Sequence, residues 1–486
     1  MVLFFSVAAC VGDDPTKDTG GAADASPDDS AAAGDGGTSV AMDGSSSADA
    51  SNDAPPVGSP SAPTGVTASP VAILAPVTTL AGSPGGGHVN GNGVGSSFLS
   101  PRGMATDAAG NVYVGDALND LVRKVTPTRD VTTFAGIFSN TLFAEGPQNT
   151  ATFNQPNGVA VDAAGNVYVA DQQNHRIRKI TPAGVTSTLA GSGTATFMEG
   201  TGTAASFNSP AGVAVDATGN VYVADGANNR IRKITALGVT STLAGSGAAT
   251  PFANGTGAAA TFSFPNGVAV DVAGNVFVAD PGNNRIRKIT AAGAVTTLAG
   301  SATGASAPFA DGTGAMATFN FPRTVALDGS GNVYVADALN HRIRRVTSAG
   351  VVTTLAGAPG NPPTPYVDGA SGIATFNNPQ GVALDSNGQV FVGDQDNKVV
   401  RKIAAVGIGQ LTVIWGVPGS TGTSAITDYT ASASAAGHPT KTCTTTGPTT
   451  CTIGPLVSGV VYSVSVTATN AAGTSAPSAA SPGVPN

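Results

Sequence analysis

Short segments in which aliphatic residues alternate with small or polar ones recur from about residue 98 to residue 404. In a representative unit they read GVAVD (158–162), VYVAD (167–171), RIRKIT (176–181) and VTSTLAG (185–191). The connecting sequences AAGN, QQNH and PAG are rich in residues that favour tight turns. The pattern predicts four short strands per unit, joined by hairpin turns.

This unit occurs six times, and its second strand is nearly identical in every copy. Successive copies begin 54 to 57 residues apart: GNVYVGD (110–116), GNVYVAD (165–171), GNVYVAD (219–225), GNVFVAD (274–280), GNVYVAD (331–337) and GQVFVGD (388–394). Repetition at such a period is typical of solenoids, propellers and arrays, and four strands per unit favour the propeller. We therefore predict an all-β fold, with a six-bladed β-propeller of four-stranded blades over residues 71–404.

The fourth-strand sequence indicates how the ring closes. VTTLAG or a variant ends the first five units, at 131–136, 186–191, 240–245, 295–300 and 352–357, whereas the sixth unit lacks it. Another copy stands ahead of the first unit, at 77–82. Because an open ring would expose two strand edges, we predict that this N-terminal strand completes the sixth blade.

The repeated signature resembles the NHL-repeat β-propeller family. The pattern P-x-G-V-A-V-D…G-N-V-Y-V-A-D-x-x-N-x-R-I-R-K is met nearly in full in units two to five, and the resemblance covers about two-thirds of the chain. Some members bind RNA, and some NHL-like lyases hold zinc through histidines near the axis. Here His175 and His341 occupy the same hairpin position three blades apart, and no spacing brings them together with His88. We expect neither a metal nor a cofactor.

After the last unit the period stops, and residues 405–486 resemble a fibronectin type III sandwich. Trp415 matches the core tryptophan of its second strand, and Tyr462 matches its tyrosine corner. Cys443 and Cys451 flank a TTTGPTT turn. We predict a hairpin disulfide between them, formed in an oxidising compartment.

The first strand of this sandwich stands far from the second. Bacterial domains of this kind commonly open with a segment like PSAPTGVTAS, found here at 60–69, whereas GQLTVIW begins only at Gly409. A propeller closed by its N-terminal strand has both ends on one blade, so it can be inserted into a host domain. We predict that 60–69 pairs with the 409–486 module. The alternative is that 60–69 is further linker.

The net charge of −8 comes from one segment. Residues 11–60 contain ten aspartates and one lysine, while the rest of the chain has 20 acidic and 21 basic residues. We interpret 11–59, which has no aromatic residue, as a disordered acidic linker. Sixteen of the 22 Lys and Arg fall in the repeated motif, interleaved with aspartates. This distribution argues against nucleic-acid binding.

The first ten residues, MVLFFSVAAC, resemble the end of a bacterial lipoprotein signal, with Cys10 as the lipidated residue. They lack a basic region and are too short for a complete signal. A start codon placed downstream of the true one would explain both defects, and a chance apolar terminus is the alternative. We expect an extracytoplasmic protein, at the cell surface or outer membrane or else secreted, whose only membrane attachment is this lipid.

The stretch DQQNHRIRK (171–179) gathers an acid, a histidine and two arginines, as an active site could. The same Asp and Arg recur around the ring, and a catalytic group is normally needed once. We therefore predict scaffold pairs across each hairpin, in which the carboxylate accepts from the guanidinium. The pairs are Asp171 with Arg176, Asp225 with Arg230, Asp280 with Arg285, and Asp337 with Arg342.

Acidic residues also precede a glycine in the long loops, where turn formation is favoured over calcium binding. They are Glu145, Glu199, Asp311 and Asp368. No Ser/His/Asp set, no carboxylate pair unique to one blade and no metal cluster stands out, so no catalytic, cofactor or metal residue is assigned. The sequence favours a monomeric, non-enzymatic binding or scaffold protein with a protein or glycan ligand. The alternative is an extracytoplasmic lyase or hydrolase with its site on the axis.

Overall fold

A computed structural model describes residues 58–70, 76–301, 309–358, 366–404, 409–436, 438–456 and 461–483. Cys10 and the stretch 11–57 lie outside the described residues. The described part consists of β-strands joined by turns, loops and three-residue 3₁₀ segments. Among these residues no helix has the length and apolarity needed to cross a membrane. The all-β fold class is confirmed.

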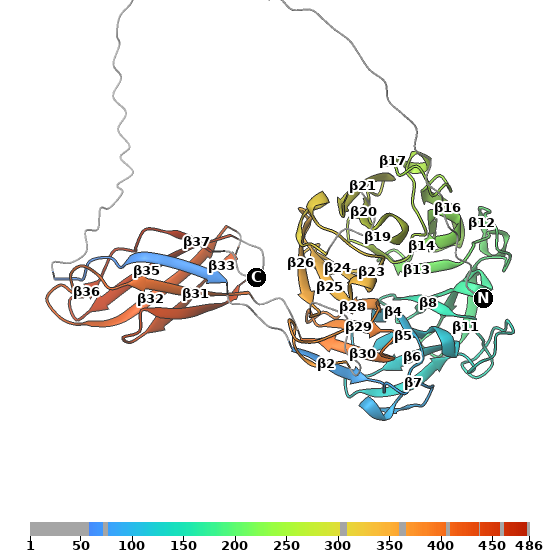
Figure 1. Ribbon diagram of the computed structural model, residues 1–486, viewed down its shortest axis with the longest axis horizontal. Helices are drawn as coiled ribbons and strands as arrows, with labels where there is room; N and C mark the ends of the chain where they lie inside the picture. The colour runs from blue at the N-terminus through green and yellow to red at the C-terminus, as the bar shows by residue number, and fades with distance from the viewer. Residues whose placement is uncertain are drawn as a thin grey trace, which may run out of the picture. The chain divides into compact units, whose positions relative to one another are not determined.

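Six antiparallel sheets are arranged around an axis, with their first strands innermost (Figure 1). Each innermost strand packs against its two neighbours, and β28 packs on β4, so the ring is closed. From the axis outward the blades are β4 (Pro101–Thr106), β5 (Val112–Asp116), β6 (Leu121–Val125), β7 (Asp130–Ala135); β8 (Pro156–Val161), β9 (Val167–Asp171), β10 (Arg176–Ile180), β11 (Thr186–Ala190); β13 (Pro210–Val215), β14 (Val221–Asp225), β15 (Arg230–Ile234), β16 (Val239–Ala244); β18 (Val268–Val270), β19 (Val276–Asp280), β20 (Arg285–Ile289), β21 (Ala294–Ala299); β23 (Pro322–Leu327), β24 (Val333–Asp337), β25 (Arg342–Val346), β26 (Val351–Ala356); and β28 (Pro379–Leu384), β29 (Val390–Asp394), β30 (Val399–Ile403), β2 (Pro76–Ala81).

Short elements of the connecting loops extend these sheets. Two-residue strands pair with the outer edge of five blades: β3 (Gly91–Asn92), β12 (Gly200–Thr201), β17 (Gly255–Thr256), β22 (Gly312–Thr313) and β27 (Gly369–Ala370). The 3₁₀ segments are η1 (Gly93–Gly95), η2 (Ala117–Asn119), η3 (Gln172–Asn174), η4 (Gly202–Ala204), η5 (Gly226–Asn228), η6 (Gly257–Ala259), η7 (Pro281–Asn283), η8 (Gly314–Met316) and η9 (Ala338–Asn340). Those that follow a second strand form part of its hairpin turn.

The N-terminal strand β2 completes the sixth blade, as predicted. It pairs antiparallel with β30, with Val77 opposite Ile403 and Thr79 opposite Arg401. The side chain of Val77 is fully buried in the core between blades five and six. The first and last parts of the propeller therefore share one sheet, and β2 covers the edge that β30 would otherwise expose.

In five of the six blades a glycine stands where the innermost strand approaches the next one closely, and blade five has Thr324 there. A Cβ on Gly158 would lie 2.6 Å from the carbonyl oxygen of Ala211 in the next blade. The corresponding glycine of that blade, Gly212, is blocked in the same way by the backbone of Asn266. The P-x-G sequence therefore allows backbone-to-backbone packing around the axis and leaves the residue before the glycine at the mouth of the ring.

The remaining strands form a sandwich around a separate core that includes Trp415, Tyr429 and Tyr462. One sheet has the order β1 (Thr64–Pro70), β31 (Gly409–Gly416), β34 (Thr450–Leu456). The other has β33 (His438–Thr445), β32 (Ile426–Ala435), β35 (Tyr462–Asn470), β36 (Gly473–Thr474), with β37 (Ser481–Gly483) on β35. The predicted disulfide Cys443–Cys451 is present and links β33 to β34.

Strand β1, which precedes the whole propeller in sequence, belongs to this sandwich. It appears in blue among the orange and red strands in Figure 1, and it pairs antiparallel with β31 from Thr64 opposite Gly416 to Pro70 opposite Leu411. Just ahead of it, the Ser61 N–H donates to the carbonyl oxygen of Ser420 at 3.0 Å. The propeller thus occupies the chain between two paired strands of the sandwich, the arrangement expected of an insertion.

Candidate functional site

The aspartate that ends each second strand is buried at the centre of a hydrogen-bond network. In the second blade, Asp171 Oδ2 accepts from Arg178 Nη1 at 2.8 Å and from Asn174 Nδ2 at 2.9 Å. Its Oδ1 accepts from the backbone N–H of Asn154 at 2.8 Å. Arg178 in turn donates to the carbonyl oxygen of Thr152 at 3.0 Å. The network ties the long loop to the hairpin of its own blade.

The sequence interpretation chose the wrong arginine of each motif for this ion pair. The predicted partners were Arg176, Arg230, Arg285 and Arg342, but the carboxylate binds the arginine two residues further on. The pairs, at 2.8 to 3.3 Å, are Asp116–Arg123, Asp171–Arg178, Asp225–Arg232, Asp280–Arg287, Asp337–Arg344 and Asp394–Arg401. Residues two apart in a strand share a face, so a long side chain at either position can reach the carboxylate.

The two arginines of the motif have different surroundings. Arg178 is fully buried, with its guanidinium 4.7 Å from the ring centre of Phe143 and 5.2 Å from that of Phe153. Arg176 is partly exposed, stacks on Phe143 at 4.0 Å and donates to the carbonyl oxygen of Ser192 at 2.8 Å. Burial raises the pKa of Asp171, although Arg178 opposes the shift. A sixfold network of this kind supports a scaffold role.

The acidic loop residues hydrogen-bond to the outer strands of their blades. The Glu145 carboxylate accepts from the backbone N–H of Thr188 at 2.7 Å, and Glu199 does the same with Thr242 at 2.8 Å. Asp311 and Asp368 make the same contact, with the N–H of Thr354 at 3.1 Å and of Thr79 at 2.9 Å. They also bind the buried arginine of their blade, Arg344 at 2.6 Å and Arg401 at 2.5 Å. Nowhere in the described residues do three or more His, Cys, Asp or Glu side chains gather so that they could hold a metal ion.

The histidines of the hairpins connect neighbouring blades. The His175 Nδ1 accepts from the N–H of Ser209 at 3.1 Å, and the His341 Nδ1 accepts from the N–H of Asn378 at 3.0 Å. At the same repeat position, Asn229 Oδ1 accepts from the next blade in the same way. Burial lowers the pKa of both histidines, which favours the neutral form that this hydrogen bond requires.

A polar cavity of about 300 Å³ lies at the end of the axis where the inner strands begin. Its wall is formed by residues at positions that differ between the repeats. The lining side chains are two arginines and seven amides: Arg102, Arg323, Gln155, Asn157, Gln172, Gln173, Asn378, Gln380 and Gln395. They come from blades one, two, five and six, so ring closure brings them together. We call this cavity the axial pocket.

The two arginines of the axial pocket have no acidic partner among the described residues. Arg102 donates from Nε to Ser100 Oγ at 3.2 Å and reaches Gln172 Oε1 from Nη1 at 3.5 Å. Arg323 lies 4.3 Å from the ring centre of Phe321. Burial lowers the pKa of Arg102, and burial together with the charge of Arg102 lowers that of Arg323 to about 10. Both stay protonated at neutral pH, so the pocket holds two uncompensated positive charges.

The sequence interpretation missed this pocket, although a signal was present. Six basic residues lie outside the repeated motif, and Arg102 and Arg323 are the two that occupy the second position of an inner strand. The same position holds Asn157 in blade two and Gln380 in blade six. A variable polar position inside an otherwise regular repeat is the feature that would have indicated a site.

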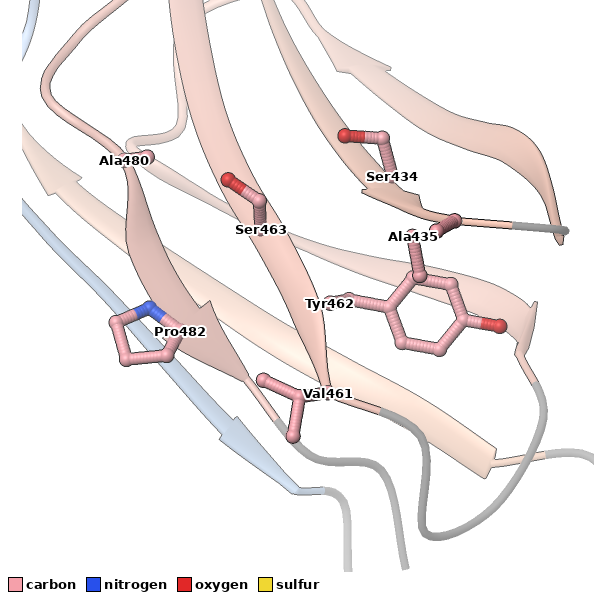
Figure 2. Close-up of a pocket in the computed structure, with 8 residues that line it drawn as sticks. Ser434, Ala435, Val461, Tyr462, Ser463, Ala480 and Pro482 are labelled. Carbon is pink, nitrogen blue, oxygen red and sulfur yellow. The ribbon is translucent and has the colours of Figure 1, made fainter.

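The other hollows offer less chemistry. One of about 340 Å³, between blades one and six, has Asp385 and Lys402, whose charges are opposite, on its wall. Two more lie elsewhere. The opposite end of the axis forms a cavity of about 220 Å³ lined by the Val-Ala-Val ends of the inner strands. The sandwich has an open hollow of about 570 Å³, with Ser434, Tyr462, Ser463 and Pro482 on its wall (Figure 2). Neither is lined by a charged side chain. The axial pocket is therefore the candidate site.

Known protein families match both parts of the chain. Residues 139–301 match the SMP-30/Gluconolactonase/LRE-like region, and residues 319–346 and 376–403 match the NHL repeat. Residues 402–484 match the fibronectin type III domain. The chloroplastic protein SUPPRESSOR OF QUENCHING 1 of Arabidopsis thaliana is 31% identical over 277 residues, which are 54% of this chain and 26% of that protein. The chain thus spans about a quarter of this relative's length.

Solved structures share the fold at low sequence identity. A protein of unknown function from Bacteroides thetaiotaomicron has a TM-score of 0.53 at 20% identity, covering 70% of this chain and 76% of that one. An auxiliary nutrient binding protein from the same organism has a TM-score of 0.52 at 17% identity, covering 70% and 77%. These similarities extend to the fold alone.

Proposed function

Because this chain joins an NHL-repeat β-propeller to a C-terminal fibronectin type III domain, we propose that it is a non-enzymatic extracytoplasmic protein that binds its ligand in the axial pocket. One observation carries the proposal: Arg102 and Arg323 line a cavity without an acidic partner in the described residues, whereas six core arginines each have one. A partly buried charge without a partner is costly unless a ligand compensates it.

The chemistry of the wall favours binding over catalysis. Side-chain amides do not titrate at ordinary pH. The Arg323 guanidinium, with its pKa lowered to about 10, is a poor proton acceptor at neutral pH. Such groups can fix a polar ligand by many hydrogen bonds, but they provide no general base. A lyase or hydrolase at this end of the axis would need a further group to accept a proton.

The disulfide bond supports an extracytoplasmic location. The Cys443–Cys451 disulfide is typical of an oxidising compartment. A fold shared with an auxiliary nutrient binding protein is compatible with ligand capture outside the cytoplasm. We propose in addition that Cys10 anchors the chain to a membrane through a lipid and that 11–59 is the tether.

The proposed site can be tested by blocking it. Gln173 is exposed on the rim of the axial pocket, so Gln173→Trp should cover the mouth without disturbing the core. Leu237 is 86% exposed in the turn between β15 and β16, at the other end of its blade, and Leu237→Trp is the matched control. The measurement is binding of the full chain to saccharide and peptide arrays. We expect the bound ligand to be lost in Gln173→Trp and kept in Leu237→Trp.

Two results would contradict the proposal. If both tryptophan variants bind the ligand as the native chain does, the site lies elsewhere. If mass spectrometry shows that the native chain cleaves the bound ligand, the protein is an enzyme.

A further inference from the structure

The charge of the axial pocket selects an anionic group. Arg102 and Arg323 line the same cavity, and none of the other seven lining residues is acidic. A guanidinium presents a planar fork of donors that matches the two oxygens of a carboxylate. The positive charge of Arg102 contributes to the lowered pKa of Arg323, so an anion placed between the two guanidinium groups would relieve their repulsion.

The amides of the axial pocket further restrict the chemical class of the ligand. Five glutamines and two asparagines offer both N–H donors and carbonyl acceptors. A phosphate or sulfate ion accepts hydrogen bonds almost exclusively, so it would leave the amide oxygens without donors. Hydroxyl groups donate and accept at the same atom and can satisfy both halves of each amide. The wall is therefore complementary to a molecule that carries a carboxylate and several hydroxyls.

An exposed aromatic residue lies on the same end of the ring. Phe264 occupies in blade four the position that Gln155 and Asn378 occupy in blades two and six, just before the inner-strand proline. Its side chain is 59% exposed, and its backbone is left-handed, with φ +51°. Its N–H is held by Asn229 Oδ1 at 2.9 Å, which explains the backbone conformation but not the exposed ring. The face of such a ring attracts the C–H groups of a sugar.

We propose that the axial pocket binds an acidic saccharide, with Arg102 and Arg323 holding the carboxylate of a uronic-acid residue, the amides holding its hydroxyls, and Phe264 packing against a neighbouring ring. This inference rests on the proposed binding function of the same site. The cavity volume of about 300 Å³ is at the lower end of the range for small-molecule sites. It suits one terminal sugar residue rather than an internal stretch of polymer.

The test compares tri-galacturonate and tri-mannuronate with their methyl esters by calorimetric titration of the full chain. Esterification removes the charge and leaves the hydroxyls in place. We expect at least one of the two acids to bind and its ester to bind about 10- to 100-fold more weakly, because a hydrogen bond to a charged group is lost. Arg102→Gln and Arg323→Gln should each weaken the binding of the acid by a similar factor. They should have little effect on the ester.

Lys441→Gln, in strand β33 of the sandwich, removes one positive charge from outside the axial pocket and is the matched control. Melting temperatures of all variants check that they fold, and the ester comparison on the native chain needs no substitution. Binding that is equal for acid and ester, binding of acidic peptides alone, or no binding by either acid would overturn the inference. If the native chain binds a neutral saccharide and the Gln173→Trp variant does not, the acidic-saccharide inference is contradicted and the proposed function still holds. If the Gln173→Trp variant binds the saccharide as tightly as the native chain, both the acidic-saccharide inference and the proposed function are contradicted.

Discussion

At the scale of single residues, the arginines of the propeller occupy two kinds of environment. Arg178 and its five counterparts are buried against aromatic rings and each bind an aspartate. Arg102 and Arg323 lie in a polar cavity with no acidic partner among the described residues. A buried ion pair costs desolvation energy that it regains only with good geometry and further hydrogen bonds, which the Asp171 network supplies. The same residue type is therefore structural in one place and available to a ligand in the other.

The roles of the two motif arginines predict different stability effects. Arg178→Met leaves the Asp171 carboxylate buried without its partner, which should cost about 3–5 kcal/mol. Arg176→Met removes a partly exposed stacking contact and hydrogen bonds to carbonyl groups, for about 1 kcal/mol. Chemical denaturation of the full chain, followed by a probe of the propeller transition, measures both. The double change Asp171→Leu with Arg178→Met should recover part of the loss, because no charge then remains buried.

If Arg176→Met were as destabilising as Arg178→Met, the assignment of the ion pair to Arg178 would be incorrect. The sequence could predict that Asp and Arg form a repeated scaffold, because both recur at fixed positions. It could not select the arginine, since residues 176 and 178 project from the same face of β10. In the structure the Arg178 guanidinium lies near both the Phe143 and Phe153 rings, whereas that of Arg176 contacts Phe143 and is partly exposed.

At the scale of elements, the strand β2 has the clearest function. Its sequence copies the outer strand of the other blades, and its pairing with β30 confirms that the copy closes the ring. The blades were predictable because each repeats the same alternation and the same turns. The short loop strands such as β3 and β12 were not predicted, since two residues carry no alternation that could indicate them.

Closure by β2 can be tested by a pair of substitutions in one strand. Val77 is buried and Thr78, the next residue, is exposed. Val77→Asp places a carboxylate in the core between two blades, which should cost about 3 kcal/mol or more and release the outer edge of blade six. Thr78→Asp faces solvent opposite Lys402 and should be nearly neutral.

Hydrogen exchange of residues 399–403 is the readout for that pair. We expect faster exchange in Val77→Asp than in Thr78→Asp or the native chain, because the N–H groups of β30 that face β2 lose their partners. Equal exchange in all three proteins would show that β2 does not protect β30 and that the sixth blade is closed in another way.

At the scale of the whole molecule, the chain leaves the sandwich after β1 and re-enters it at β31. The displaced segment PSAPTGVTAS made this arrangement predictable, because the second strand at Gly409 had no first strand directly before it. The axial pocket could not be predicted in this way, because no single stretch of the sequence indicates it. Its residues are separated by up to about 290 positions and meet only because the ring closes, so no local pattern joins them.

The most direct test of ligand binding in the axial pocket is a crystal structure of the full chain with the acidic trisaccharide that binds best. We expect density for a sugar ring at the mouth of the axis, with its carboxylate oxygens about 2.7–2.9 Å from the guanidinium groups of Arg102 and Arg323. Density for the sugar at the valine-lined end of the axis, or on the sandwich surface around Tyr462, with the axial pocket filled only by water, would contradict it.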